Sequence, residues 1–429
     1  MKRVDIISLG CSKNLVDSER LMAQLRANNI SVAHDPDVPQ GEVAVINTCG
    51  FIGDAKEESI NTILQFADAK QRGKLKKLYV MGCLSERYRE ELQEQIPEVD
   101  RFYGKFDWNG IVKELGATYR RDLMNERSLT TPGHYAYLKI SEGCNRMCSY
   151  CAIPLITGPH TSRPMEEIRE EVRRLAASGV KELQVIAQDL SSYGTDLYHA
   201  NKLAELVDSL TEIDGIEWVR LHYAYPAGFP HDILDVMAAN PKVCNYLDIA
   251  LQHSSDHMLK QMLRHISKAK TIELLDEIRQ RVPGIHLRTT LITGHPGETE
   301  EDFADLMDFV RTQRFERLGV FPYSHEDDTY AWKNYADDIP EEVKQERADM
   351  IMALQEGISA EINRAKVGKD LKVIIDREED GYLVGRTEFD SPEVDPEVIV
   401  HGNANVGDFC TVRITDSEDY DLIGNVVNK

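Results

Sequence analysis

The stretch SEGCNRMCSYCAIP (141–154) holds three cysteines within eight positions, Cys144, Cys148 and Cys151. The apolar run YAYLKIS (135–141) leads into it and predicts a buried strand, so the cysteines follow the carboxyl end of that strand. The stretch lacks the second CxxC or the histidine pair that a structural zinc site needs. Cysteine thiolates also hold iron–sulfur clusters, whose cubane form takes four ligands. Three cysteines therefore leave one iron of a cubane without a ligand from this stretch.

Five more strand patterns follow, separated by helical patterns such as MEEIREEVRRLAASG (165–179), which ends at a glycine. The strand patterns are ELQVIAQ (182–188), EWVRLHYA (217–224), YLDIALQ (246–252), IHLRTTLITG (285–294) and RLGVFPYS (317–324). Six strand–helix units in about 230 residues predict a partial (β/α)6 version of the eight-unit barrel. Such barrels keep their chemistry at the carboxyl ends of the strands, where the three cysteines lie.

Residues 1–120 alternate strand and helix as well, which predicts a Rossmann-like parallel α/β domain. The predicted strands are VDIISLG (4–10), VAVINTC (43–49) and LKKLYVMGC (75–83). Cys11, Cys49 and Cys83 lie at their carboxyl ends, the edge at which parallel sheets bind ligands. One such cysteine is most simply a buried apolar residue. Three at equivalent positions favour a shared metal site.

The remaining segments complete the predicted organisation. The polar stretch YRRDLMNERSLTTPGH (119–134) indicates a linker, and an amphipathic helix over 340–368 leads away from the barrel. Short β-rich runs with turn residues then predict a small closed β-barrel. These runs are VIID, YLVGRTE, EVIVHG, DFCTVRITD and DYDLIGNVV. We expect an α/β protein with domains at 1–120, 130–364 and 365–429.

Composition predicts a cytoplasmic protein without membrane contact. The N-terminal MKRVDIISLGC has an apolar run of six residues that contains Asp5, which is too short for a signal-peptide core and predicts a strand. No apolar run reaches the ~20 residues that cross a bilayer. Thiols stay reduced in the cytoplasm, so the eight cysteines indicate metal ligands or catalytic groups rather than disulfides. Cys244 and Cys410 have no partner pattern and are expected to be structural.

The run Cys144-Asn-Arg-Met-Cys148-Ser-Tyr-Cys151 resembles the CxxxCxxC signature of radical S-adenosylmethionine (SAM) enzymes. The three spaced cysteines before it and the β-barrel after it narrow the resemblance to the methylthiotransferases. Their order of methylthiotransferase domain, radical SAM barrel and TRAM domain matches all three predicted segments. LGCSKNLVDSE (9–19), LHYAYP (221–226) and ALQHSSDHMLKQM (250–262) resemble the branch that modifies ribosomal protein S12. The tRNA-modifying branch carries a Gln-Met-Asn-like run where this chain has Ser12-Lys13-Asn14.

The resemblance implies two [4Fe–4S] clusters and SAM as cofactors. One cluster lies on Cys144, Cys148 and Cys151, binds SAM and yields a 5′-deoxyadenosyl radical, which takes hydrogen from the β-carbon of an aspartate. The second, auxiliary cluster lies on Cys11, Cys49 and Cys83 and carries the sulfur to be inserted. No side chain is expected to be a catalytic group, because this chemistry belongs to the cofactors. A low-potential electron donor and a sulfur donor are implied as partners.

The resemblance also suggests residues that contact SAM. Gln188 and Asp189 end the second barrel strand, where the family binds the methionine part of SAM. Tyr150 lies between two cluster ligands, beside the expected position of the adenine. Arg288 lies within the fifth strand, where its cation suits the SAM carboxylate, although an ordinary salt bridge explains it equally well.

The charge of the chain favours a protein substrate. Residues 365–429 contain 7 Lys and Arg against 15 Asp and Glu, a net charge of −8, within a chain of net charge −23. A domain that grips tRNA should be basic, whereas an acidic one attracts a strongly basic ribosomal protein such as S12, free or in the small subunit. The alternative explanation of such a run is acidity that serves only solubility. A tRNA adenosine methylthiotransferase and a non-enzymatic iron–sulfur or zinc module that binds ribosomes are the alternatives.

Overall fold

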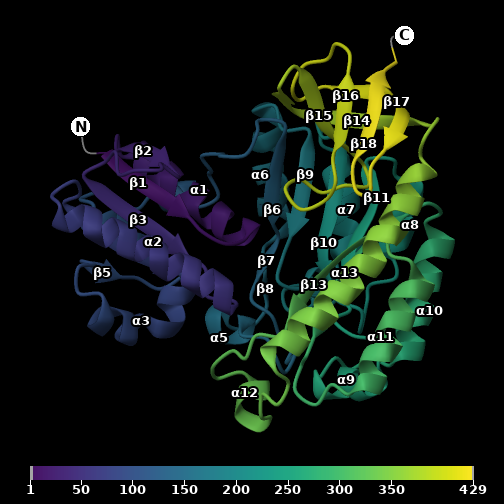
Figure 1. Ribbon diagram of the computed structural model, residues 1–429. Helices are drawn as coiled ribbons and strands as arrows, with labels where there is room; N and C mark the ends of the chain where they lie inside the picture. Colours follow the sequence, from purple (N-terminus) through teal and green to yellow (C-terminus); the bar gives the residue numbers. More distant parts are fainter. Residues whose placement is uncertain (1–2, 428–429) are drawn as a thin grey trace. The chain divides into compact units, whose positions relative to one another are not determined.

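The computed structural model describes residues 3–427, which fold as two compact units (Figure 1). The first unit contains the chain up to Thr131 together with Glu142–Arg146 and Ala152–Thr161. The second contains Pro132–Ser141, Met147–Cys151 and the chain from Ser162 onward. The cysteine-rich stretch therefore contributes residues to both units.

The first unit is built on a five-stranded sheet in the order β2-β1-β3-β4-β5, with every pair parallel. The strands are β1 (Arg3–Ser8), β2 (Ser31–His34), β3 (Val43–Thr48), β4 (Lys77–Gly82) and β5 (Arg101–Phe102). The predicted parallel α/β domain is confirmed. The edge strands β2 and β5 were not predicted, because one is half-exposed and the other has only two residues.

Helices cover both faces of this sheet because side chains alternate along each strand. Val4 and Ile6 of β1 point to one face, where they pack against the helices α1 and α4. Ile7 points to the other face, which packs against α2 and α3. The helices are α1 (Ser12–Ala27), α2 (Gly53–Gln71), α3 (Cys83–Gln95) and α4 (Trp108–Glu114), followed by the short 3₁₀ helix η1 (Arg121–Leu123).

The second unit contains a six-stranded parallel sheet in the order β13-β12-β11-β10-β9-β6. The strands are β6 (Tyr135–Lys139), β9 (Glu182–Ile186), β10 (Trp218–Ala224), β11 (Val243–Ile249), β12 (His286–Thr293) and β13 (Arg317–Pro322). The prediction of six barrel strands is confirmed. Each strand starts within three residues of its predicted start.

Helices alternate with these strands. The remaining elements are β7 (Ser141–Glu142), α5 (Ile153–Thr157), β8 (Thr161–Ser162), α6 (Met165–Ala177), η2 (Leu190–Ser192), α7 (Leu203–Thr211), α8 (Ile233–Ala239), α9 (Asp256–Gln261), α10 (Lys268–Arg281), α11 (Glu300–Gln313), α12 (Tyr330–Asn334) and α13 (Glu341–Arg364). The long helix α13 packs along β13 and β12. Within residues 3–427, no helix has both the length and the apolar character to span a membrane.

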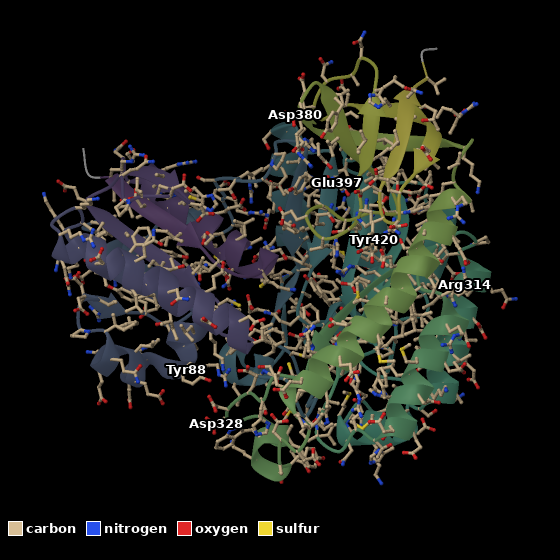
Figure 2. The ribbon with its side chains drawn as sticks, in the orientation of Figure 1. Tyr88, Arg314, Asp328, Asp380, Glu397 and Tyr420 are labelled. Atoms are coloured by element: carbon tan, nitrogen blue, oxygen red, sulfur yellow. The ribbon has the colours of Figure 1, made fainter. Side chains whose placement is uncertain are left out.

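The end of the chain forms a closed barrel in the order β14-β15-β16-β18-β17, which confirms the predicted small β-barrel. The strands are β14 (Asp370–Glu379), β15 (Tyr382–Thr387), β16 (Val398–His401), β17 (Phe409–Ser417) and β18 (Leu422–Val426). Its core includes Val373, Val400 and Ile414. Asp380 at the β14–β15 turn and Tyr420 before β18 are exposed, whereas Glu397 is partly buried (Figure 2).

The segment between β15 and β16 covers the amino-terminal ends of the six-stranded sheet. Asp390 accepts a hydrogen bond from Nε of Arg317, the first residue of β13, at 3.0 Å. Phe389 stacks on the ring of His286, the first residue of β12, with the ring centroids 4.0 Å apart. The small barrel is thus attached at the amino-terminal ends of the strands, and the carboxyl ends remain available to the cysteine-rich stretch.

Candidate functional site

The structure places Cys11, Cys49 and Cys83 at the carboxyl edge of the first sheet. Cys11 is the N-cap of α1, Cys49 directly follows β3, and Cys83 is the first residue of α3. Strands β1 and β3 are neighbours at the point where the strand order reverses. Sheets of this order bind ligands at that point. Two of the three cysteines therefore flank the position at which this fold usually binds a ligand.

Two glycines make the close approach of these loops possible. Gly10 has φ of 84°, and a Cβ there would lie 2.5 Å from Cβ and 2.8 Å from Sγ of Cys49. Gly82 has φ of 99°, and a Cβ there would lie 2.5 Å from Oδ1 of Asn47. Only glycine adopts these conformations without strain and also avoids these contacts. The glycine before Cys11 thus allows its loop to contact Cys49.

Asn14 connects the three strand ends through one buried side chain. Its Nδ2 donates to the backbone oxygens of Leu9 at 3.1 Å and Thr48 at 2.9 Å, at the ends of β1 and β3. Its Oδ1 accepts from Sγ of Cys83 at 3.5 Å, after β4. The asparagine of the LGCSKN run therefore fixes the relative positions of the loops that carry the cysteines.

The three thiols are close enough to influence one another electrostatically. Burial, with a smaller contribution from the charge of Cys11, raises the pKa of Cys49 to about 11. Burial likewise raises the pKa of Cys83 to about 12, against the opposing effect of Lys105 and with added effects of Cys11 and Cys49. Both thiols are therefore protonated at neutral pH until a metal displaces the proton.

Lys105 places a buried positive charge beside this cysteine set. The side chain is 3% exposed, and its Nζ lies 3.3 Å from Oδ2 of Asp17 and 3.8 Å from Oε1 of Glu142. Its distance to Sγ of Cys83 is 4.0 Å. Burial lowers the pKa of Lys105, but the two carboxylates raise it well above its ordinary value. A permanent cation therefore faces the thiol, where it stabilises a thiolate or an anionic cluster.

Cys144 lies in the loop after β7, within the first unit. Its backbone N–H donates to the oxygen of Gly158 at 3.2 Å, and its Sγ accepts from the N–H of Arg146 at 3.4 Å. Gly143, just before it, has φ of 77°, and a Cβ there would lie 2.1 Å from the backbone oxygen of Pro159. The position of the first cysteine of the run thus depends on a glycine that directly contacts backbone.

We expect Gly143→Ala to lower the loading of iron on the Cys144–Cys148–Cys151 set about tenfold relative to Gly158→Ala, if the clash adds ~1.4 kcal/mol or more. Gly158 also has a positive φ, 71°, and nothing within 4 Å of its added Cβ, so this control introduces a side chain at positive φ without the clash. Iron and sulfide content after anaerobic reconstitution measure the effect. Equal loading of the two variants would contradict the expectation.

Cys148 and Cys151 are held within the second unit. Cys151 donates its backbone N–H to the oxygen of Cys148 at 3.1 Å, which closes a turn between them. Sγ of Cys148 accepts from Nη1 of Arg264 at 3.2 Å and lies 3.6 Å from the hydroxyl of Tyr225. Ser149, the first of the two residues between them, donates its N–H to the oxygen of Met262 at 3.0 Å. These contacts fix the turn against the loop that follows α9.

The residues predicted to contact SAM occupy different surroundings. Tyr150 accepts at its hydroxyl from Arg264 at 3.1 Å. Asp189 is buried and accepts from the N–H of Ser191 at 2.9 Å, so it caps η2, and the partly buried Gln188 directly precedes it. Arg288 donates from Nε to Asp395 of the β15–β16 segment at 3.1 Å. Arg288 thus has a carboxylate partner within the protein, and its role toward SAM stays a prediction, as do those of the other three.

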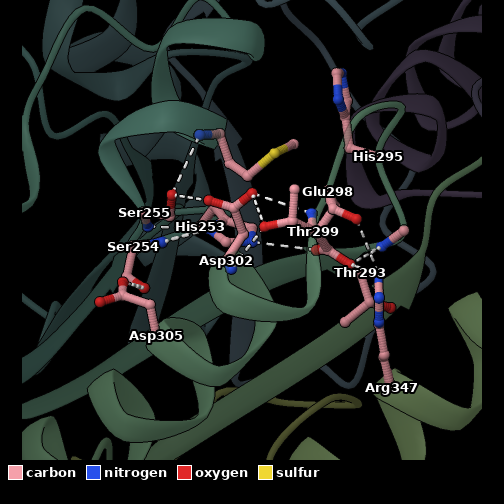
Figure 3. A network of polar contacts seen from close by, with 12 residues as sticks. His253, Ser254, Ser255, Thr293, His295, Glu298, Thr299, Asp302, Asp305 and Arg347 are labelled. Carbon is pink, nitrogen blue, oxygen red and sulfur yellow. Dashed lines mark hydrogen bonds and ion pairs between the residues drawn. The ribbon is translucent and has the colours of Figure 1, made fainter.

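The turn TGHPGET (293–299) after β12 is fixed by a buried polar network (Figure 3). Nδ1 of His253 accepts from two backbone N–H groups, so its Nε2 donates to Oε1 of Glu298 at 3.1 Å. The other oxygen of Glu298 accepts from the N–H of Gly294 at 2.9 Å and from Arg347 of α13 at 2.5 Å. The turn is therefore held firmly at the carboxyl end of a barrel strand.

Asn14, Lys105 and Arg264 all lie against the cysteines, although the sequence pattern predicts no role for them. Asn14 has a local signal, since it sits three residues after Cys11 in the first helical turn. Lys105 and Arg264 have none, because each reaches its thiol only through tertiary contacts. Cys244 is buried within β11 beside Trp218, as expected of a structural cysteine.

Comparison with known proteins agrees with this geometry. An incomplete barrel with a CxxxCxxC run defines a radical SAM protein, and the family profile described as the radical SAM superfamily matches residues 138–310. Profiles described as uncharacterized protein family UPF0004 and TRAM domain match residues 3–104 and 367–427. A solved structure of the radical SAM methyltransferase TsrM from Kitasatospora setae has a TM-score of 0.54 at 13% identity and covers 75% of this chain and 72% of its own. That likeness supports the fold.

Two relatives identify the particular family. A Phocaeicola vulgatus protein named ribosomal protein uS12 methylthiotransferase RimO is 61% identical over 432 residues, covering 100% of both chains. A protein of the same name from Porphyromonas gingivalis is 61% identical over 430 residues, covering 99% of both chains. The chain therefore belongs to the RimO family of ribosomal protein uS12 methylthiotransferases.

The radical SAM family implies SAM and a [4Fe–4S] cluster, and the residues present fit the cluster. Within residues 3–427, no three His, Cys, Asp or Glu side chains are arranged to share one metal ion, so the fit rests on donor type and nearby charge. The donors are thiols, which suit iron–sulfur clusters. The buried cation of Arg264 faces Sγ of Cys148 at 3.2 Å and suits an anionic cluster there.

Proposed function

We propose that this chain methylthiolates the β-carbon of an aspartate in ribosomal protein S12. The observation that carries the proposal is identity of about 60% over the full length with proteins named for this activity. The proposed domains are residues 1–120, 130–364 and 365–429, in the order methylthiotransferase, radical SAM and TRAM.

The proposed radical SAM cluster site consists of Cys144, Cys148 and Cys151. When bound, SAM and the cluster supply a radical that removes hydrogen from carbon. The side chains bind and orient these groups and exclude water. Tyr150, Gln188, Asp189 and Arg288 are proposed to hold SAM.

A second [4Fe–4S] cluster is proposed on Cys11, Cys49 and Cys83. Its support is the position of three cysteines at one sheet edge, the effect of neighbouring cysteines on the pKa of Cys49 and Cys83, and the buried cation of Lys105. The inserted sulfur is assigned to this cluster. A sulfur donor and a low-potential electron donor are the partners that the reaction requires.

The proposed S12 partner suits the charge of the terminal barrel. Glu378, Glu379 and Asp380 are exposed at its first hairpin, and the domain carries a net charge of −8 over residues 365–429. Acidic surface attracts a basic ribosomal protein and repels tRNA. A ribosomal substrate and reduced thiols fit a cytoplasmic location.

We expect the reconstituted chain, with SAM and a reductant, to modify an S12 loop peptide and to leave tRNA unmodified. Mass spectrometry detects methylthio-aspartate in the peptide, and nucleoside analysis covers the tRNA. A matched peptide with asparagine in place of the target aspartate is the control. Modification of tRNA alone would replace this proposal with the tRNA enzyme, and a colourless zinc protein would point to a non-enzymatic module.

A further inference from the structure

Arg264 is a buried cation with an unusual set of partners. The residue follows α9, and its side chain is almost completely inaccessible at 2% exposure. Its Nη1 donates to Sγ of Cys148 at 3.2 Å and to the hydroxyl of Tyr150 at 3.1 Å. Its Nη2 donates to the backbone oxygen of Ala250. Among residues 3–427, no carboxylate forms an ion pair with it.

Other buried arginines of the second unit differ in this respect. Arg220 pairs with Glu182 at 2.9 Å, and Arg317 pairs with Asp390. A buried charge without a counterion is strongly unfavourable, so such groups are normally paired. Among the described residues, the thiol of Cys148 is the only group within hydrogen-bond distance of Arg264 that becomes fully anionic when it binds a metal. The guanidinium therefore suits the cysteine in its thiolate form.

The surroundings hold the guanidinium in this position. Its plane lies over the ring of Tyr225, with Cζ 4.1 Å from the ring centroid, a cation–π contact in a buried setting. The hydroxyl of Tyr225 donates to the backbone oxygen of Arg264 at 3.0 Å. The flanking Leu263 and His265 both have φ of 55°, in the left-handed region. Backbone and ring contacts thus fix the residue independently of its hydrogen bond to sulfur.

A charged N–H···S hydrogen bond has a defined effect on an iron–sulfur cluster. Hydrogen bonds to the sulfurs and nearby charge are among the factors that set the reduction potential of a cluster. Reduction adds one electron, so the cluster becomes more negative. A fixed cation beside a ligand sulfur stabilises that reduced form more than the oxidised form, and the potential rises.

We propose that Arg264 is a positioning residue that orients the Cys148 thiolate and raises the reduction potential of the cluster on Cys144, Cys148 and Cys151. This inference rests on the proposed assignment of a cluster to these three cysteines. The role differs from that of Tyr150, Gln188, Asp189 and Arg288, which are proposed to contact SAM. Arg264 touches the ligand and acts through it.

The test is a redox titration of the reconstituted full-length chain, followed by electron paramagnetic resonance. The Cys11→Ala background removes one ligand of the second proposed cluster so that a single signal is titrated. Arg264→Gln is expected to lower the one-electron reduction constant about tenfold or more, which corresponds to about 59 mV. Arg264→Lys keeps the charge and loses the planar fork, so a smaller shift in the same direction is expected.

Arg279→Gln is the matched control. Arg279 of α10 donates from Nη1 and Nη2 to Gln313, at 3.0 and 2.6 Å, and contacts none of the cysteines. This substitution also removes one positive charge from the second unit. The one-electron reduction constant is expected to change less than threefold. An Arg264→Gln shift no larger than that of this control, or an upward shift, would overturn the inference.

Iron and sulfide analysis separates the two proposals. The Cys11→Ala variant should hold one cluster, and adding Cys148→Ala should remove it. If it does not, the assigned cluster site is wrong. If Arg264→Gln does not bind a cluster, the reduction potential of Arg264→Lys is measured in its place. A potential equal to that of the Cys11→Ala background overturns the inference. If neither variant loads while the Arg279→Gln control does, Arg264 has a structural role instead, and the redox role is rejected.

Discussion

Cys148→Ala is expected to abolish reductive cleavage of SAM, whereas Cys49→Ala is expected to leave cleavage intact and to stop formation of the methylthio product. Cys148 belongs to the set proposed to bind SAM through its cluster, so its loss removes the radical source. Cys49 belongs to the set at the edge of the other sheet, within the first unit. Release of 5′-deoxyadenosine measures cleavage, and mass spectrometry of the S12 peptide measures methylthiolation.

Each variant is also expected to lose about four irons per chain, because each set is proposed to hold one cubane. Cys410→Ala is the control, since this partly buried cysteine of the terminal barrel lies in the β17 strand with no cysteine partner pattern. It should keep both activities and the full iron content. Loss of cleavage in Cys49→Ala equal to that in Cys148→Ala would contradict the assignment of separate tasks to the two sets.

The strand-end cysteines were predictable because parallel sheets impose a simple geometry. Alternating strands and helices place every strand in the same direction, so residues after strands gather at one edge. Cys49 and Cys83 follow their strands directly, as the pattern indicated. Cys11 lies three residues beyond the end of β1, yet Gly10 brings its loop against Cys49. The strand pattern and Gly10 therefore explain why Cys11, Cys49 and Cys83 lie at the same edge of the sheet.

The charged residues around the cysteines were not predictable in the same way. Lys105 reaches Cys83 from the loop after β5, a strand of two residues that carries almost no pattern. Arg264 reaches Cys148 across a sequence separation of 116 residues. Local periodicity describes which face a residue occupies and says nothing about a partner so distant in the chain.

For Arg288, the position in the fold was predictable from the sequence but the partner was not. Its place within β12 was predicted, but its partner Asp395 belongs to the β15–β16 segment of the terminal barrel. Nothing in the sequence pattern of either domain announces that this segment covers the strand ends. The sequence allowed Arg288 to form an ordinary salt bridge, but only the tertiary structure identifies Asp395 as its partner.

The same attachment contains a buried ion-pair network. Glu182, the first residue of β9, is fully buried and accepts from Nε of Arg220 at 3.0 Å and from Nη2 of Arg386 at 2.7 Å. Arg386 of β15 also donates from Nε to Asp376 at 2.6 Å. Burial raises the pKa of Glu182, but the charges of Arg386 and Arg220 outweigh it, so the pKa lies below its ordinary value.

Glu182→Gln is expected to destabilise the second unit by about 3–5 kcal/mol, because the buried Arg220 then loses its carboxylate partner and Arg386 keeps only Asp376. The unfolding midpoint should fall by on the order of 10 °C, measured by calorimetry. Glu397→Gln is the matched control. It breaks a two-point pair with Arg377, at 2.5 and 2.8 Å, in which Arg377 is 46% and Glu397 35% exposed, and should cost about 1 kcal/mol or less.

The difference in unfolding free energy between the native chain and Glu182→Gln should become smaller as the pH falls. A carboxylate with a lowered pKa contributes stability above the ordinary glutamate value of 4.5, and that contribution is lost as the pH falls through the lower folded-state value. The gap between the native chain and Glu182→Gln should therefore be full at pH 7 and narrow progressively below about pH 4. A gap at pH 7 no larger than that of Glu397→Gln, or one that widens in acid, would show that Glu182 does not hold the terminal barrel on the strand ends.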